Sequence, residues 1–284
     1  MAIEIAVFGA DDSPRGKRFV EALRASGGIP WMVSSFAPDI PATERICGAL
    51  FFDGPSVRTP SAMHHIRQML AFLGIPWFRV GNDSDAGPNA VDAEGGWLRD
   101  DKTDDALIHA LTSNRHSAPL TSETELHLAE SFATAGAQAL REMAHTEPVV
   151  RRTFRQAIDR WLGDVAAEIM TEGKTFDAIA FGATDATALA LTRRVLGNAN
   201  RTLDAGIIED CMGELANVIA GQAKALLAQS THRFTFATPH VMRFGTKENR
   251  SGRRDVMVAS LFTDCGPVAV QWRPPRYIGE SRAM

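Results

Sequence analysis

Two polar side chains interrupt a regular helical pattern in the second half of the chain. Glu214 and Asn217 lie in the segment 207–229, where apolar residues otherwise recur every three or four positions. This spacing predicts a helix with one buried face. Because residues three apart project from one side of a helix, the carboxylate and the carboxamide can grip one small polar target together. Gly221, one turn further on, costs about 1 kcal/mol of helix stability relative to Ala, which indicates that something packs or docks close to the backbone.

Three carboxylates form a second candidate site. Asp11 and Asp12 follow an apolar run at 3–9, and Asp53 ends another at 46–53. The carboxyl ends of parallel strands gather at one edge of a sheet, so these side chains would converge there. Converging carboxylates repel one another, and a bound hard divalent cation such as Mg²⁺ usually offsets this repulsion. The alternative interpretation is three solvated loop acids.

The first 111 residues alternate between strand and helix patterns, which predicts a doubly wound parallel sheet of the α/β class. Ser13 is a candidate N-cap, and Pro14 suits the first helical position. The segment 37–45 carries two prolines, so we expect a loop or a short helix there. The expected strands are 3–9, 31–36, 46–53, 75–81 and 95–99, with helices after Ser13, at 59–73 and at 103–111.

A polar stretch, 112–121, separates this domain from the rest and predicts a linker. Ser122 and Glu125 then form a capping box that opens a helix reaching about residue 143. An Arg-rich helix is expected at 149–162, and residues 276–284 are expected to form a flexible tail. Further strands are predicted at 164–170, 176–181, 234–237, 240–243, 256–262 and 268–272, with a helix at 184–196 that Thr184 caps.

Composition limits the class of protein. A length of 284 residues suggests two domains, and a formal charge of −4 gives no basic footprint for nucleic acid. No apolar stretch is long enough to span a bilayer, and the start of the chain has no signal-peptide pattern. The three cysteines are scattered and form no close ligand pair, which indicates reduced thiols in a cytoplasmic protein.

The run GELANVIAGQAKALL, at 213–227, resembles the signature of the CheX branch of the CheC/CheX/FliY phosphatases. The segments 237–245 and 256–272 resemble the strand entry and closing hairpin of that family, so the resemblance covers roughly 121–272. It implies an α+β domain at 122–275, in which a long helix packs on an antiparallel sheet. It also implies that Glu214 and Asn217 remove phosphate from the aspartyl phosphate of a receiver domain.

The resemblance implies a division of labour that elementary chemistry supports. In-line attack on phosphorus requires a positioned water and management of charge. Asn217 can orient the water without titrating, because its amide both accepts and donates hydrogen bonds. Glu214 is implied to pair with the Lys of the receiver, and the receiver is implied to hold the Mg²⁺. The family resemblance also implies a homodimer.

The first domain resembles a receiver, with Asp53 at the position of the phosphoacceptor and Asp11 and Asp12 as Mg²⁺ ligands. It departs from the receiver pattern where the fourth strand should end in Thr or Ser, because Gly81 stands there. Arg99 replaces the Lys expected after the fifth strand, and guanidinium cannot copy the compact ammonium. This pattern indicates a degenerate receiver.

Three functional hypotheses follow from these observations. The first is a phosphatase for phosphorylated receiver proteins in chemotaxis-type or two-component signalling, with no nucleic-acid or membrane partner. The second is a non-catalytic adaptor that binds signalling partners through both domains. The third is a self-contained switch in which Asp53 is phosphorylated and the second domain removes the phosphate. The departures at Gly81 and Arg99 disfavour the switch, and the presence of both Glu214 and Asn217 favours the phosphatase over the adaptor.

Overall fold

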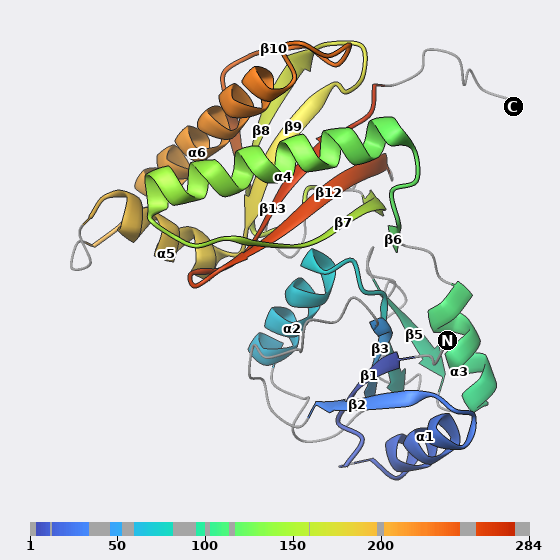
Figure 1. Ribbon diagram of the computed structural model, residues 1–284. Coiled ribbons are helices and arrows are strands. Elements are labelled where there is room, and N and C mark those ends of the chain that lie inside the picture. Colours follow the sequence, from blue (N-terminus) through green and yellow to red (C-terminus); the bar gives the residue numbers. More distant parts are fainter. Residues whose placement is uncertain are drawn as a thin grey trace, which may run out of the picture. The chain divides into compact units, whose positions relative to one another are not determined.

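The computed structural model divides the chain into two compact units, residues 1–117 and 118–284, which are considered separately (Figure 1). The division falls inside the segment 112–121 that the sequence predicts as a linker. The predicted tail, 276–284, and the proline-bearing segment 37–45 lie outside the described residues. The structure describes residues 4–11, 13–33, 46–52, 60–81, 95–99, 103–113, 117–158, 160–197, 202–244 and 254–275.

Unit 1 is built on a five-stranded sheet whose strands are all parallel. Its strand order, β2-β1-β3-β4-β5, is one of the two common doubly wound orders, so the predicted architecture is confirmed. That order agrees with a receiver-like fold, while receiver identity itself stays a prediction. The strands are β1 (Glu4–Phe8), β2 (Ile29–Val33), β3 (Ile46–Phe52), β4 (Trp77–Gly81) and β5 (Gly95–Arg99).

Helices cover both faces of this sheet. Helices α1 (Pro14–Ala25) and α3 (Asp104–Ser113) bury Phe19 and Leu111 in one apolar cluster, and α2 (Pro60–Phe72) buries Leu70 in another. Alternate residues of β1 enter the two clusters, because successive side chains of a strand point to opposite faces. As predicted, Ser13 caps α1, and its hydroxyl accepts a hydrogen bond from the Gly16 amide at 3.2 Å.

The described residues of unit 2 form an eight-stranded sheet and three helices. The order is β10-β8-β9-β13-β12-β7-β6, with β11 also paired to β8, and the ladders from β10 to β7 are antiparallel. This arrangement confirms a long helix packed on an antiparallel sheet. The strands are β6 (Ser117–Ala118), β7 (Val149–Ile158), β8 (Val165–Glu172), β9 (Ala178–Ala183), β10 (Thr235–Phe236), β11 (His240–Arg243), β12 (Arg254–Thr263) and β13 (Gly266–Arg273).

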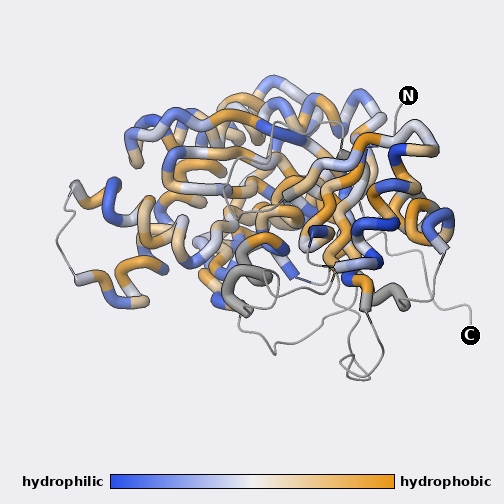
Figure 2. The backbone as a smooth tube through the Cα atoms, turned by 90° about the horizontal axis from the view of Figure 1, so that it is seen from below, coloured by the Kyte–Doolittle hydropathy of each residue, from blue (hydrophilic) through white to orange (hydrophobic). Residues whose placement is uncertain are grey.

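The three helices of unit 2 lie on one face of its sheet (Figure 1). They are α4 (Glu123–Ala144), α5 (Asp185–Val195) and α6 (Ala205–Leu226). Hydrophobic and hydrophilic positions alternate along the helices, as expected when one side of each is buried (Figure 2). An aromatic chain joins the layers: Phe132 of α4 stacks on Trp272 of β13 with ring centroids 4.9 Å apart. Phe132 also meets Phe176 at 5.4 Å, and Phe176 meets Phe234 at 4.9 Å.

The helix caps follow the predicted chemistry. The Ser122 hydroxyl accepts a hydrogen bond from the Glu125 amide at 3.2 Å, and the Glu125 carboxylate accepts one from the Ser122 amide at 3.2 Å. This reciprocal pair is the capping box that opens α4. The Thr184 hydroxyl accepts from the Thr187 amide at 3.1 Å and caps α5. Both caps confirm the sequence prediction.

One predicted element of unit 2 is wrong. Residues 149–162, expected as an Arg-rich helix, form strand β7 along Val149–Ile158. Val258 of β12 pairs with Phe154 in the ladder, and Phe154, Gln156 and Ile158 are buried on alternate positions. Three residues spaced by two, each buried, show the periodicity of a strand. The exposed Val149 and Val150 at the start of the segment hide that periodicity in the sequence.

Candidate active site

Helix α6 carries the predicted catalytic pair, and its sequence explains where it begins. The Asp204 carboxylate accepts a hydrogen bond from the Ile207 amide at 2.9 Å, which satisfies one of the unpaired amides at a helix start. The inner side of the helix is fully apolar, and Leu215 is 0% exposed, as predicted. This buried side consists of Cys211, Met212, Leu215, Ala216, Ile219, Ala220 and Ala223.

The outer side of α6 brings Glu214 and Asn217 together. Both side chains are exposed, as is Asp210 one turn before them. Residues three apart on a helix rise by about 4.5 Å and have Cβ atoms about 5–6 Å apart. Among the described residues, neither side chain has a hydrogen-bond partner. A carboxylate and a carboxamide therefore stand side by side, exposed and available to a partner that approaches the helix.

Gly221 continues this outer side one turn further along. It is exposed, and a Cβ placed on it would meet no atom of the described chain within 4 Å. None of the described residues of unit 2 packs against it, so they do not supply the close packing expected from the sequence. The glycine leaves open space above the backbone beside Asn217. Its role toward an approaching partner stays a prediction.

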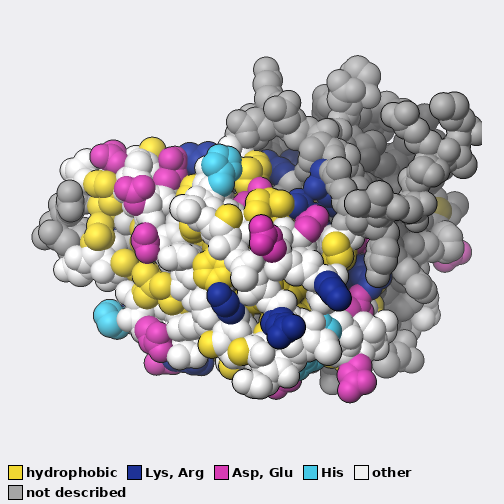
Figure 3. Space-filling model, turned by 90° about the horizontal axis from the view of Figure 1, so that it is seen from above, with side chains coloured by type: hydrophobic (Ala, Val, Ile, Leu, Met, Phe, Trp, Pro, Cys, Tyr) yellow, Lys and Arg dark blue, Asp and Glu magenta, His cyan; other side chains and the backbone are white. Residues whose placement is uncertain are grey.

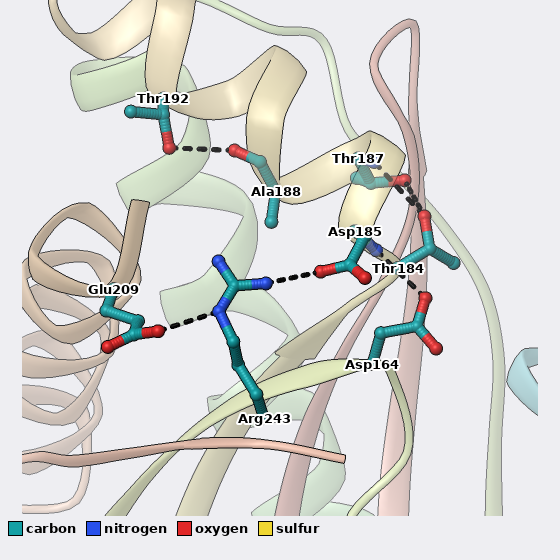
Figure 4. A network of polar contacts seen from close by, with 8 residues as sticks. All are labelled: Asp164, Thr184, Asp185, Thr187, Ala188, Thr192, Glu209 and Arg243. Carbon is teal, nitrogen blue, oxygen red and sulfur yellow. Dashed lines mark hydrogen bonds and ion pairs between the residues drawn. The ribbon is translucent and has the colours of Figure 1, made fainter. Parts of the chain in front are cut away.

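A network of polar contacts fixes the first turns of α6 (Figure 4). Arg243, the last residue of β11, donates from Nε to Glu209 Oε1 at 2.7 Å and from Nη1 to Asp185 Oδ1 at 2.6 Å. Asp164 accepts a hydrogen bond from the Asp185 amide at 3.0 Å. Charged hydrogen bonds of this kind are directional, so β11, α5 and α6 are held in one geometry.

Arg243, Glu209 and Asp185 could not be predicted from the sequence. They lie on three different elements and have no shared spacing in the chain, so no motif marks them. A second polar contact joins the other helices: the Gln222 amide of α6 donates to Glu142 of α4 at 2.9 Å. The two contacts connect α6 to the sheet and to the neighbouring long helix. Both lie within one or two turns of the candidate pair.

Cys211 lies on the inner side of α6, three residues before Glu214. Burial raises the pKa of its thiol, a hydrogen bond with Thr192 lowers it, and the nearby charge of Glu214 raises it. A raised pKa keeps the sulfur protonated near neutral pH, whereas a thiol nucleophile needs a lowered pKa. The cysteine therefore packs in the core and contributes no nucleophile to the outer side of the helix.

The predicted carboxylate site of unit 1 is described only in part. Asp11 is exposed in a turn after β1, while Asp12 and Asp53 lie outside the described residues. Strands β1 and β3 are parallel neighbours, with Phe8 beside Phe51, so their carboxyl ends do meet at one edge. Within the described residues, no group of three His, Cys, Asp or Glu could hold a metal ion. The Mg²⁺ site stays a prediction, and the chemistry of α6 does not depend on it.

The outer surface of unit 2 offers a mixed environment to a partner. Acidic, basic and hydrophobic side chains are interspersed on the face seen in Figure 3. Two leucines are unusually exposed on the long helices, Leu126 at 50% and Leu226 at 47%. None of the described helices is both long and apolar enough to cross a membrane.

Helix α6 lies in a segment that matches the model of a known protein family. Residues 165–259 match the family model of the chemotaxis phosphatase CheX. The CheX-like segment begins at β8, ends within β12 and contains the whole of α6, including Glu214 and Asn217. It covers the middle of unit 2 and none of unit 1. No curated protein matched the chain.

Solved structures of the CheX and CheC type are similar to about half of the chain. The CheX chemotaxis protein from Desulfovibrio desulfuricans is 26% identical with a TM-score of 0.47, over 52% of this chain and 99% of its own. CheX from Vibrio vulnificus is 21% identical with a TM-score of 0.41, over 52% and 99%. A CheX–CheY–BeF3–Mg complex from Borrelia burgdorferi is 17% identical with a TM-score of 0.40, over 51% and 96%.

Proposed function

We propose that this chain is a phosphatase for the aspartyl phosphate of receiver domains in chemotaxis-type signalling. The observation that carries the proposal is the exposed pair of Glu214 and Asn217 on α6, within the segment that matches the CheX family model. The matched family is described as a chemotaxis phosphatase, and this description supports the class of reaction that we propose. The exposure and proximity of the two side chains supply a surface suited to it.

The chemistry assigned to Asn217 is the positioning of water. Its carbonyl accepts a hydrogen bond from water, and its amide donates one to a phosphoryl oxygen. The water oxygen forms a bond to phosphorus as the bond from phosphorus to the aspartyl oxygen breaks, leaving a carboxylate and inorganic phosphate. The proton of the water leaves with the phosphate or passes to solvent. An amide does not titrate, so the step gains from orientation and not from a protein base.

The chemistry assigned to Glu214 is the capture of a cation on the receiver. Its side chain is exposed on the same side of α6 as Asn217, and an exposed carboxylate can pair with a lysine of an approaching protein. That pairing would fix the register of the receiver so that its phosphoryl group meets Asn217. The Mg²⁺ required for the chemistry is assigned to the receiver substrate and not to α6. We further propose that the chain acts as a homodimer, as the family resemblance implies.

One observation in unit 1 favours the adaptor hypothesis. Strand β4 ends at Gly81 directly beside Arg99 at the end of β5, at the sheet edge where a receiver has Thr or Ser and Lys. A receiver-like sheet with this edge suits a docking module that is not itself phosphorylated. Unit 1 is therefore assigned partner binding, and unit 2 the hydrolysis.

A dephosphorylation time course tests the proposal. A phosphorylated CheY-type receiver with Mg²⁺ is followed with no addition, with the full chain, and with its Asn217→Ala variant. Asp210→Asn is the matched control, because Asp210 is exposed on the same helix one turn before Glu214. We expect the chain and the control to accelerate the loss of phosphate and Asn217→Ala not to. Equal acceleration by Asn217→Ala would overturn the mechanism, and no acceleration of any receiver by the wild type would favour the adaptor.

A further inference from the structure

Unit 2 contains a pocket whose wall is rich in arginine. Its volume is about 720 Å³, within the range of about 300–1,000 Å³ typical of small-molecule sites. Three guanidinium groups face it, those of Arg160, Arg254 and Arg273, together with the carboxylate of Glu168. Arg243 also borders the pocket, but its guanidinium is bonded to Glu209 of α6 and Asp185 of α5 on the helix side of the sheet.

The pocket lies on the side of the sheet opposite the helices. Ile169, Met257 and Trp272 belong to the core beneath α4 and α6, and their strand neighbours Met170, Val256 and Arg273 line the pocket. Because successive residues of a strand point to opposite faces, the pocket faces away from the helix layer. Its place in the fold therefore separates it from Glu214 and Asn217.

One of the pocket arginines, Arg273, is held rigidly by carboxylates. Arg273 donates from Nε to Asp177 at 2.6 Å, its Nη1 lies 3.5 Å from Glu168, and its side chain is only 14% exposed. Its guanidinium also stands over the ring of Trp161 at 5.4 Å. Held guanidinium groups lose little freedom on binding, which favours recognition of a fixed anion.

A second arginine, Arg160, is more exposed. The guanidinium of Arg160 lies 5.7 Å from the ring of Phe244, and the side chain is otherwise open to solvent. Apolar side chains line the same pocket: Phe244 is half-buried, and Met170 is 50% exposed. Guanidinium groups match phosphate and carboxylate oxygens, and the apolar side chains match a ring or a short carbon skeleton.

We propose that this pocket binds a small organic anion, a phosphate or carboxylate group carried on an apolar body. The anionic group lies against Arg160 and the held guanidinium of Arg273. The apolar body lies against Phe244 and Met170. The site is separate from the phosphatase chemistry and does not depend on it.

Isothermal titration calorimetry of the full chain tests this site without any receiver present. The probes are AMP for a phosphate, benzoate for a carboxylate, and adenosine as a neutral body. We expect saturable binding of AMP or benzoate and none of adenosine. AMP alone identifies phosphate as the anionic group, and benzoate alone identifies carboxylate. Adenosine binding as tightly as AMP, or no saturable heat from either anion, would overturn the proposal.

Paired variants locate the site. Arg160→Gln should weaken binding of the anion about tenfold, the size expected for one charged hydrogen bond. Arg151→Gln is the matched control, because Arg151 is also exposed and lies over a phenyl ring, that of Phe262, at 5.9 Å. It should bind as the wild type does. Met170→Glu places a carboxylate in the wall at an exposed position and should abolish binding, with folding checked by circular dichroism. Unchanged binding in both Arg160→Gln and Met170→Glu would place the ligand elsewhere.

Discussion

The Nε atom of Arg243 donates a hydrogen bond over 2.7 Å to Oε1 of Glu209, which ties strand β11 to the first turns of α6. Glu209 lies five residues before Glu214 on the same helix. The Arg243 side chain is 33% exposed and that of Glu209 37%, so water screens the pair only in part. The contact holds the helix that presents the candidate pair without itself touching that pair.

Removing this contact should loosen the start of α6. In Arg243→Gln we expect a loss of about 1 kcal/mol in the free energy of unfolding, since partly exposed ion pairs contribute little more. We also expect phosphatase kcat to fall more than KM changes, because the orientation of Asn217 is affected and the docking surface is not. Arg194→Gln is the control, since Arg194 pairs with Asp264 at a more exposed site. A fall in kcat of the same size in both variants would argue against a positioning role.

Glu214 should act through its charge. In Glu214→Gln the side chain keeps its shape, but it loses the attraction to a lysine on the receiver, so we expect kcat/KM to fall about tenfold or more. The salt dependence of kcat/KM should weaken at the same time, because screening acts on that attraction. Steady-state rates at two ionic strengths measure both effects. If Glu214→Gln keeps the salt dependence of the wild type, Glu214 has no cationic partner.

Leu215 should contribute to stability and not to chemistry. Its side chain is 0% exposed between the two candidate residues, so Leu215→Ala should lower the free energy of unfolding by about 2–5 kcal/mol. Leu226→Ala on the same helix is the control, because that side chain is 47% exposed and should cost far less. Urea denaturation of the two variants measures the difference. Equal midpoints would show that the inner side of α6 is not packed as described.

Substitutions at Gly221 should distinguish effects on folding from effects on docking of the receiver. With open space around it and a helical backbone, Gly221→Ala should raise the free energy of unfolding by about 1 kcal/mol. Gly221→Gln should also fold well, yet its long side chain would occupy the space that we assign to the receiver. We therefore expect Gly221→Gln to retain stability and to lose phosphatase activity by a rise in KM. Full activity of Gly221→Gln would mean that the receiver does not approach this turn.

Local chemistry made several elements predictable from the sequence. The capping box of Ser122 and Glu125 and the cap at Thr184 involve residues a few positions apart, so the spacing alone contains the information. The same holds for the buried and exposed sides of α6, which follow from a 3.6-residue period. Glu214 and Asn217 could be placed on one exposed side for this reason.

Other features depend on residues that are distant in the chain. The sequence of β7 does not show a strand pattern, because Gln156 is buried and Val149 is exposed. This is the reverse of the usual burial of apolar side chains and exposure of polar ones. Its pairing with β12 joins segments about a hundred residues apart, and no local pattern records that pairing. The Arg243 network has the same character, since each of its carboxylates comes from a different element.

The aromatic chain through unit 2 provides a reporter of its own. Trp272 is fully buried and stacks on Phe132, so the indole of a sheet strand has its surroundings set by a side chain of α4. Aromatic contacts of this geometry persist only while the two rings keep their relative position. A change in the near-ultraviolet signal of unit 2 would therefore register the separation of α4 from the sheet. In a denaturation experiment, the signal of Trp272 shows whether a variant of α6 has lost the packing of the helices on the sheet. A variant that loses only the function of the exposed side chains leaves that signal unchanged.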